Sequence, residues 1–252
     1  MKKLSILGAL FVSLGATSAW ATNACPTVQT ALSTYIATGF SCEIGDKVFS
    51  NFTYTDSSQN ATPIGAGAVE VETLGPTTGT DPAELSNAMI GLQFNAGWSV
   101  TSSCVANVCT GAELDSDIGF TVTVINGANM AITDAAVAQT ASGAAGQGAV
   151  ASVAEGVCAG TGCTPGTWNV FTFINSGGSQ TAQDTTISPS GTVTVSKDIS
   201  VTAGAFAGST ATLTQVDDTF SQTATGVPEP GTMALAGFAL CGLAAIRRRR
   251  AA

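Results

Sequence analysis

Ile118-Gly119-Phe120-Thr121-Val122-Thr123-Val124 is the stretch of sequence that decides the fold. Its apolar side chains alternate with small residues, so the apolar ones point to a single face of an extended chain. One apolar face opposite a small polar face is typical of an antiparallel sheet that covers a core on one side only. The stretch therefore predicts a sheet with one face in a core.

Similar strand-like runs recur along the chain, separated by connectors rich in Gly, Asn, Asp or Ser. From Lys47 onward we expect Val48, Ser50, Phe52 and Tyr54 on one face of a strand and Phe49, Asn51, Thr53 and Thr55 on the other. The other runs are Ala68–Leu74, Met89–Phe94, Ala149–Ala154, Trp168–Ile174, Thr192–Val201 and Ala211–Val216. About eight to ten short strands predict a mainly β protein, an antiparallel β-sandwich of jelly-roll or immunoglobulin-like layout. A solenoid is the alternative, but we find no repeat of fixed length.

Two short segments carry helix signals. Val28, Leu32, Tyr35 and Ile36 recur at helical spacing and predict a short helix before Gly39. Asp81-Pro82-Ala83-Glu84 resembles a helix start with a cap and a proline in the first turn. The Ala- and Gly-rich stretch 135–148 is expected to be a loop between strands or a hinge between two small domains.

The N-terminus predicts export. Met1-Lys2-Lys3 is a positively charged start, and residues 4–16 form an apolar stretch without charge. Small residues at Ala19 and Ala21 favour cleavage after Ala21, which makes residues 1–21 a signal peptide. This reading implies signal peptidase as a partner during export.

The C-terminus contains a second segment that predicts the location of the protein. Val227-Pro228-Glu229-Pro230 is followed by 14 uncharged residues, Met233–Ile246, and then by Arg247, Arg248, Arg249 and Arg250. The arginines are costly to move through a bilayer and would hold their end in the cytoplasm, so the run predicts a short transmembrane helix that anchors the chain transiently in the inner membrane. The three parts in this order resemble the PEP-CTERM sorting signal of Gram-negative bacteria, with residues 227–252 as the signal. The resemblance implies recognition at Pro228, Glu229 and Pro230 and processing by an exosortase, a membrane protease.

Residues 22–226 remain as the secreted body. Of the 8 basic residues only Lys47 and Lys197 lie in it, and of the 17 acidic residues only Glu229 lies outside it, so its formal charge is 2 − 16 = −14. Such a charge disfavours nucleic acids and anionic membrane surfaces as partners and leaves cations as plausible ligands.

Six of the 7 cysteines lie in this body as three local pairs. We expect the disulfides Cys25–Cys42, Cys104–Cys109 and Cys158–Cys163 in an oxidising compartment. Zinc is the competing interpretation because two pairs have C-x4-C spacing, but the chain contains no histidine.

The sequence contains few candidate catalytic or metal-binding residues. Without histidine, a serine–histidine or cysteine–histidine catalytic site cannot be assembled, and no phosphate-binding loop is present. Paired carboxylates leave a hydrolase as a remote alternative. Glu113, Asp115 and Asp117 alternate along an extended segment, so their carboxylates share one side, and calcium is the ion that such oxygens bind. Asp217-Asp218 is a weaker calcium candidate, and we expect no other cofactor. Trp98 and Trp168 lie in strand-like runs and are expected to pack in the core.

Residues 42–54 and 117–122 resemble an ectodomain that recurs in secreted PEP-CTERM proteins, which implies one β-rich body and no particular activity. We therefore expect an exported, non-enzymatic protein at the cell surface or in the extracellular matrix of a Gram-negative bacterium, with a structural or interaction role in exopolysaccharide or biofilm. The alternative is an adhesion module that binds carbohydrate or calcium.

Overall fold

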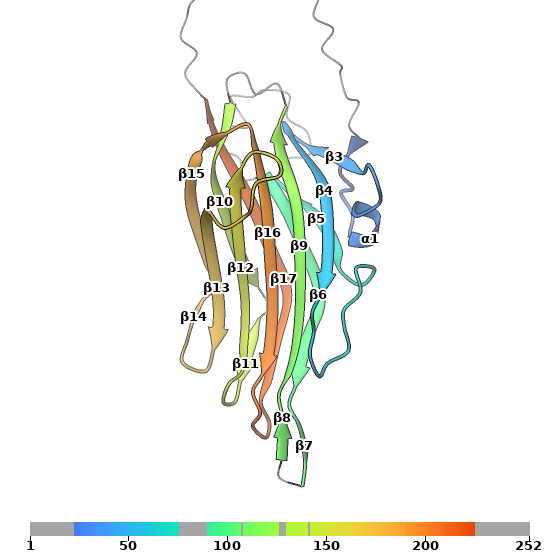
Figure 1. Ribbon diagram of the computed structural model, residues 1–252, viewed down its shortest axis with the longest axis vertical. Helices are drawn as coiled ribbons and strands as arrows, with labels where there is room; N and C mark the ends of the chain where they lie inside the picture. Colours follow the sequence, from blue (N-terminus) through green and yellow to red (C-terminus); the bar gives the residue numbers. More distant parts are fainter. Residues whose placement is uncertain (1–22, 76–89, 107, 126–129, 141, 225–252) are drawn as a thin grey trace, which may run out of the picture.

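Two β-sheets pack face to face in the computed structural model, which describes residues 23–75, 90–106, 108–125, 130–140 and 142–224 (Figure 1). The first sheet has eight strands in the spatial order β1 (Asn23–Ala24), β3 (Ser41–Ile44), β4 (Lys47–Asp56), β9 (Ala112–Val124), β16 (Thr192–Ala203), β12 (Val150–Ala159), β13 (Trp168–Asn175) and β14 (Gly178–Gln180). The decisive stretch at residues 118–124 belongs to β9, which lies between β4 and β16.

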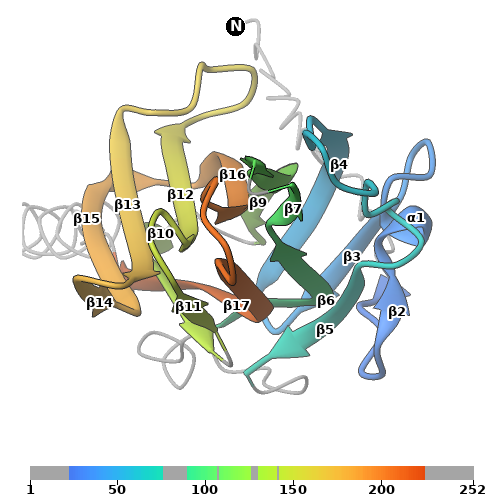
Figure 2. The ribbon, with the colours of Figure 1, turned by 90° about the horizontal axis from the view of Figure 1, so that it is seen from below.

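The second sheet has seven strands in the order β15 (Ala182–Ser190), β10 (Met130–Thr140), β17 (Thr210–Ala224), β6 (Ile90–Thr101), β5 (Glu70–Leu74) and β2 (Thr30–Ala31), with β11 (Gly143–Ala145) also paired to β17. β7 (Ser103–Val105) and β8 (Val108–Thr110) form a separate hairpin that extends beyond one end of the sheets (Figure 1). β1 and β3 pair in parallel, whereas the long strands pair antiparallel. Figure 2 shows the two layers end-on. The predicted mainly β sandwich is confirmed.

The core lies between the two layers and is centred on Phe120. Ile118, Phe120, Val122 and Val124 are all buried, as their alternation predicted. The Phe120 ring packs against four other phenylalanine rings. The distances between ring centroids are 5.6 Å to Phe52, 6.1 Å to Phe94, 6.1 Å to Phe220 and 6.3 Å to Phe49. These rings come from both sheets, so replacing Phe120 by Ala would cost about 3–5 kcal/mol of stability.

β4 departs from the predicted alternation because it bulges. Asn51 has a φ of 55°, and the pairing with β9 shifts between Ser50 and Thr53. Asn tolerates this left-handed conformation better than most residues, and the extra residue turns the following side chain back toward the core. Phe49 and Phe52 are therefore both buried, at 0% and 7% exposure, and the prediction that they lie on opposite faces is wrong.

The Ala-rich stretch 135–148 was expected to be a loop, and this expectation is also wrong. Its first part continues β10, which pairs with β15 on one side and β17 on the other, and its second part contains β11. Ala135 and Val137 are buried and face the core, whereas Ala136 and Ala138 lie on the outer face of the sheet. The sequence did not predict this strand because its run of alanines shows no clear alternation of apolar and polar residues.

The first predicted helix is present but short. α1 covers Leu32–Tyr35, and both of these residues are buried. Val28 and Ile36 are 69% and 38% exposed, so they do not join the core as their spacing predicted. The second predicted helix, at Asp81–Glu84, lies outside the described residues.

All three predicted disulfides are present. Cys25–Cys42 connects β1 to β3, Cys104–Cys109 closes the β7–β8 hairpin, and Cys158–Cys163 ties the end of β12 to the loop that follows it. The zinc interpretation is therefore wrong for these six residues, since each sulfur is bonded to another.

Both lysines of the body are buried. Lys47 and Lys197 have no exposed surface, although lysine is among the residues most often found at the surface. Lys47 Nζ pairs with Asp46 at 3.2 Å, and Lys197 pairs with Glu155 and Asp218. Since residues 22–226 contain no other lysine or arginine and no histidine, the folded body presents no basic side chain to solvent.

Candidate functional site: the outer face of the eight-stranded sheet

A continuous row of side chains crosses the outer face of the eight-stranded sheet. Phe171 on β13 is paired with Ala154 on β12, Ala154 with Asp198 on β16, Asp198 with Asp117 on β9, and Asp117 with Thr55 on β4. Directly paired residues on one face lie about 4.5–5.5 Å apart at their Cβ atoms. The pairing therefore brings an aromatic ring and a group of acids onto one surface.

Three carboxylates of this face form an acidic cluster: Asp115, Asp117 and Asp198, with one oxygen from each within 4.8 Å of the others. Asp115 and Asp117 share a side because they are two residues apart on β9. Asp198 joins them from β16 because it is paired with Asp117. Oxygens at this spacing match what calcium needs from several carboxylates at once.

The connection after β4 supports Asp115. The Ser57 hydroxyl donates to Asp115 Oδ2 at 2.6 Å, and the backbone N–H of Asp115 donates to the Ser58 hydroxyl at 3.0 Å. The backbone N–H of Ser58 in turn donates to Asp56 Oδ1 at 3.0 Å. Asp115 is thus held in a fixed position, whereas Asp198 is exposed.

Partial burial and then mutual repulsion raise pKa values in the cluster. Partial burial, followed by the charge of Asp115, a hydrogen bond to Asp115, and the charges of Asp117 and Glu113, raises the pKa of Asp198 to about 6. Burial and then the charge of Asp115 also raise the pKa of Asp117. Because the body exposes no cationic side chain, a cation from solution is the partner that would relieve this repulsion.

The sequence predicted two of the three cluster members. Glu113 lies on the same outer side of β9, but its carboxylate accepts a hydrogen bond from Ser200 at 3.0 Å and is not among the three clustered oxygens. Asp198 takes its place. Sequence reasoning missed Asp198 because it is 81 positions beyond Asp117 and only the sheet register brings the two together.

Asp217 and Asp218 do not form the predicted weaker cation site. Asp218 is fully buried and pairs with Lys197, whereas Asp217 points to the outer face of the seven-stranded sheet. There Gln93 Nε2 donates to Asp217 Oδ1 at 2.8 Å, and Gln215 Nε2 donates to it at 3.0 Å. Neighbouring residues of a strand face opposite sides, so these two carboxylates cannot share an ion.

An exposed aromatic pair lies beside the acidic cluster. The rings of Phe171 and Phe173 stack with centroids 5.8 Å apart and an interplanar angle of 25°, and Phe171 is 48% exposed. Between Phe171 and Asp198 the surface forms a depression of about 580 Å³. Thr164, Pro165 and Gly166 line one side of it, in the connection that follows the Cys158–Cys163 disulfide.

The tryptophans are not part of this surface. Trp98 is fully buried, and Trp168 is partly buried and packs against the core, as predicted for both. The aromatic residues that remain available on the outer face are phenylalanines, which the sequence did not distinguish from core residues.

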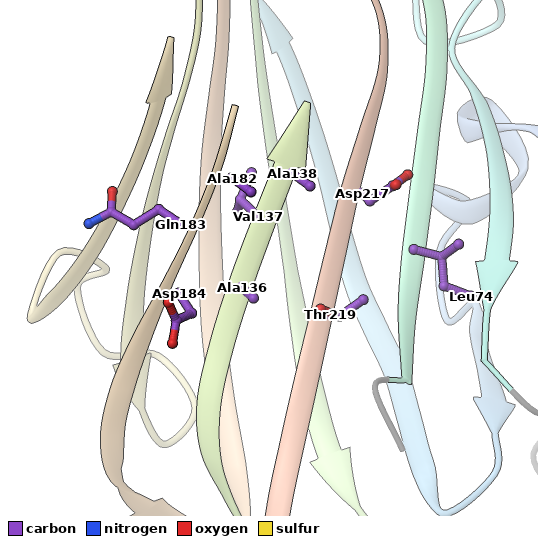
Figure 3. Close-up of a pocket in the computed structure, with 9 residues that line it drawn as sticks. All are labelled: Leu74, Ala136, Val137, Ala138, Ala182, Gln183, Asp184, Asp217 and Thr219. Carbon is purple, nitrogen blue, oxygen red and sulfur yellow. The ribbon is translucent and has the colours of Figure 1, made fainter. Parts of the chain in front are cut away.

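A second depression, of about 410 Å³, lies on the outer face of the seven-stranded sheet (Figure 3). Alanines from β10 and β15 form much of it, and its polar residues are Gln183, Asp184, Asp217 and Thr219. Asp217 is already held by two glutamine side chains, and no aromatic residue lines the depression. This depression therefore has fewer side chains available for ligand binding than the face with the acidic cluster.

Several predicted residues lie outside the described residues: Pro228, Glu229 and Pro230, Arg247 to Arg250, and the signal peptide at residues 1–21. Within the described ranges, no helix has the length and apolar character required to cross a membrane. The predicted transmembrane run Met233–Ile246 is not among them.

Comparison with known protein families finds a match at the C-terminus of the chain. Residues 226–250 match the PEP-CTERM protein-sorting motif. No curated protein sequence matches the chain significantly. The motif implies export from a Gram-negative cell, a surface location and an exosortase as processing partner. The chain therefore carries a PEP-CTERM sorting motif at residues 226–250, which is consistent with an exosortase substrate.

Proposed function

We propose that residues 22–226 are delivered to the cell surface or the extracellular matrix and act there without catalysis, as a structural or interaction protein of exopolysaccharide or biofilm. The observation that carries the proposal is the PEP-CTERM motif at residues 226–250. The β-sandwich contains three disulfides. Disulfides form and persist in oxidising compartments, so they fit a protein that works outside the cytoplasm.

The charge distribution supports a role in a hydrated matrix. All exposed charges of the described body are carboxylates, because both lysines are buried. A surface of one sign stays soluble and monomeric through self-repulsion, and divalent cations bridge it to other polyanions. Acidic matrix polysaccharide held through calcium is therefore the partner that this surface favours.

Sorting is tested by changing the motif in the native host. Replacing Pro228, Glu229 and Pro230 together by Ala should leave the chain in the inner membrane with Arg247 to Arg250 still attached. The unchanged protein should reach the surface or the medium without the arginines. Fractionation with mass spectrometry of the C-terminus gives both results. Pro63→Ala, an exposed proline of the body, is the control.

A surface form that retains the arginines would overturn the sorting proposal. The matrix role needs a separate readout, which is the amount of protein retained in isolated matrix and the mass of biofilm in a deletion strain. Unchanged biofilm together with free release of the protein into the medium would contradict that role.

The second candidate is an adhesion module that binds carbohydrate. The observation that favours it is the exposed ring of Phe171, stacked on the half-buried Phe173, beside polar and acidic groups in the depression of about 580 Å³. An aromatic face with a few placed polar groups is a typical arrangement for ligand binding, since the ring covers apolar surface while the polar groups fix orientation.

Binding of purified protein to a glycan array and to the host's exopolysaccharide tests this candidate. Phe171→Ala should weaken binding by roughly 5- to 150-fold, because such a contact contributes about 1–3 kcal/mol. Phe206→Ala removes a ring that is 50% exposed elsewhere and is the matched control. Equal loss in both variants, or no binding by the unchanged protein, would count against the module.

A further inference from the structure

Glu155, Lys197 and Asp218 form a charged cluster inside the sandwich. Glu155 on β12 and Lys197 on β16 are direct partners in the eight-stranded sheet, and Asp218 lies on β17 of the opposite sheet. None of the three side chains has exposed surface. Lys197 Nζ lies 3.2 Å from Asp218 Oδ2 and also bonds to Glu155 Oε2, so one amine contacts both acids across the interface between the sheets.

The cluster is enclosed by apolar side chains. The residues two positions away on the same three strands point into the same space, and each is at most 1% exposed: Val153, Val157, Val195, Ile199, Val216 and Phe220. Among the described residues, no donor outside the cluster forms a hydrogen bond with Glu155 Oε1 or with either carboxyl oxygen of Asp218. The three groups therefore have only one another as polar partners in that part of the chain.

Two acids and one amine cannot all be charged at low cost in such a place. Burial, followed by the negative charge of Glu155, raises the pKa of Asp218 well above its ordinary value, although Lys197 opposes the shift. Burial lowers the pKa of Lys197, but the charges of Asp218 and Glu155 together place it above its ordinary value. The favoured state is thus a neutral carboxylic acid at Asp218 beside the ammonium group of Lys197, which is also bonded to Glu155.

We propose that Lys197 and Asp218 join in an intramolecular isopeptide bond between Nζ and Cγ, and that Glu155 moves the protons of this reaction. The geometry has what amide formation needs: an amine within about 3–3.5 Å of the carboxyl group, a contacting carboxylate that acts as base and acid, and exclusion of the water that would reverse the reaction.

The step balances without any further reagent. Lys197 passes one ammonium proton to Glu155 and becomes a neutral amine, whose lone pair attacks Cγ of protonated Asp218. The N–C bond forms and the C–OH bond breaks. Glu155 gives its proton to the leaving hydroxyl, which departs as water, and receives a second proton from the nitrogen. The products are an amide, one water molecule and a neutral Glu155, and no atom changes its oxidation state.

This bond would join β16 to β17 and so connect the two sheets covalently through the core. It would differ from the three disulfides because thiols cannot reduce it. Formation would follow folding, since only the folded chain brings the amine and the carboxyl group together and removes them from water.

The sequence itself supplies a sharp test. Lys197 is the only basic residue between Lys47 and Arg247, so trypsin has a single cleavage site in that segment. Trypsin does not cut after a lysine whose amine is part of an amide. The full chain, produced with its own signal peptide in a Gram-negative host, is purified, denatured, reduced, alkylated and digested with trypsin before mass spectrometry.

In the expected result the fragment that begins at Val48 extends uncut past Lys197 and is lighter than its sequence by the mass of one water molecule. Cleavage after Lys197 would overturn the proposal. Loss of one water molecule together with cleavage after Lys197 would also overturn it, because the loss would then lie at another place.

Variants test the role of Glu155. Glu155→Gln keeps the shape of the side chain but cannot carry the protons, so trypsin should cut after Lys197 and the mass loss should disappear. Glu113→Gln on the outer face is the matched control and should retain the bond. A bond that still forms in Glu155→Gln would overturn the role of Glu155. If this variant does not fold, the digest of the unchanged protein decides on the bond by itself.

Discussion

Trp98 on β6 donates its indole N–H to the hydroxyl oxygen of Ser116 on β9 at 3.1 Å, across the interface between the two sheets. Ser116 Oγ also lies 3.1 Å from the hydroxyl of Tyr54, and Tyr54 donates its own proton to the Ile64 carbonyl. Ser116 must therefore donate to Tyr54, which completes a chain of three hydrogen bonds. Because Ser116 lies between Asp115 and Asp117, this chain positions the strand that carries most of the acidic cluster.

Replacing Ser116 by Ala should destabilise the protein by about 1–3 kcal/mol, because it leaves the buried indole N–H without an acceptor and removes a donor to Tyr54. Urea denaturation of the two proteins measures the difference. Ser179→Ala, at an exposed position of β14, should change stability by less than about 0.5 kcal/mol. Equal effects of the two substitutions would show that the hydrogen-bond chain contributes nothing.

The acidic cluster predicts a pH dependence of stability. The pKa of Asp198 is raised from 3.8 to about 6, so the folded state holds this proton more tightly than the unfolded state does. The resulting stability is fully present below about pH 4 and is lost as the pH rises through about 6. Asp198→Asn should therefore raise stability at pH 7 by about 1 kcal/mol, after a discount for its half-exposed position, and leave it unchanged at pH 4.

Denaturation midpoints at the two pH values measure this effect. Ser196→Ala changes an exposed, uncharged residue of the same strand and is the control, with no expected difference between the two pH values. A gain in Asp198→Asn that is the same at pH 4 and pH 7 would contradict the shifted pKa.

Calcium should stabilise the protein through the same three carboxylates. If the site binds with a dissociation constant of about 1 mM, as in extracellular modules, then 10 mM calcium adds about 1.4 kcal/mol, or roughly 3–6 °C in Tm. Asp117→Asn should abolish the shift, and Asp184→Asn should retain it. Scanning calorimetry with calcium and with a chelator gives the comparison, and equal melting temperatures in both would remove calcium as a ligand.

The disulfides should differ in their effect on stability. Cys25–Cys42 spans 17 residues and ties β1 to β3, so replacing both cysteines by Ser should cost about 3 kcal/mol. Cys104–Cys109 closes a hairpin whose Val105 and Val108 are 75% and 71% exposed, so its loss should loosen only the hairpin. Thermal unfolding should show a clear decrease in Tm for the first pair of substitutions and almost none for the second. A comparable decrease for both would show that the hairpin is coupled to the sandwich.

The sequence predicted those parts of the fold that depend on local pattern. Strict alternation at residues 118–124 and the spacing of six cysteines were sufficient for β9 and for the three disulfides. The alternation rule failed at Asn51, where a bulge inserts one residue, and it did not detect the second half of β10, where alanines occupy both inward and outward positions. In both places the conformation of the segment depends on its pairing with neighbouring strands and not on its own sequence alone.

The sites depend on register, which a single strand does not encode. Asp115 and Asp117 could be grouped from their alternation, but Asp198 joins them only through the pairing of β16 with β9. The sequence did not identify Lys197 or Asp218 as buried, since lysine and aspartate seldom are. Their burial follows from the inward alternation of β16 and β17, where they occupy positions otherwise filled by valine, isoleucine or phenylalanine.

The burial of Lys47 and Lys197 leaves the folded body without a reactive primary amine on any exposed side chain. Biotin or dye reagents that tag bacterial surface proteins through lysine will pass over this one, even where it is abundant. Reagents that couple to carboxylates will mark it many times. A survey of the cell envelope based on amine tagging would therefore label this protein through its terminal α-amine at most and undercount it, and carboxylate chemistry would show its true abundance.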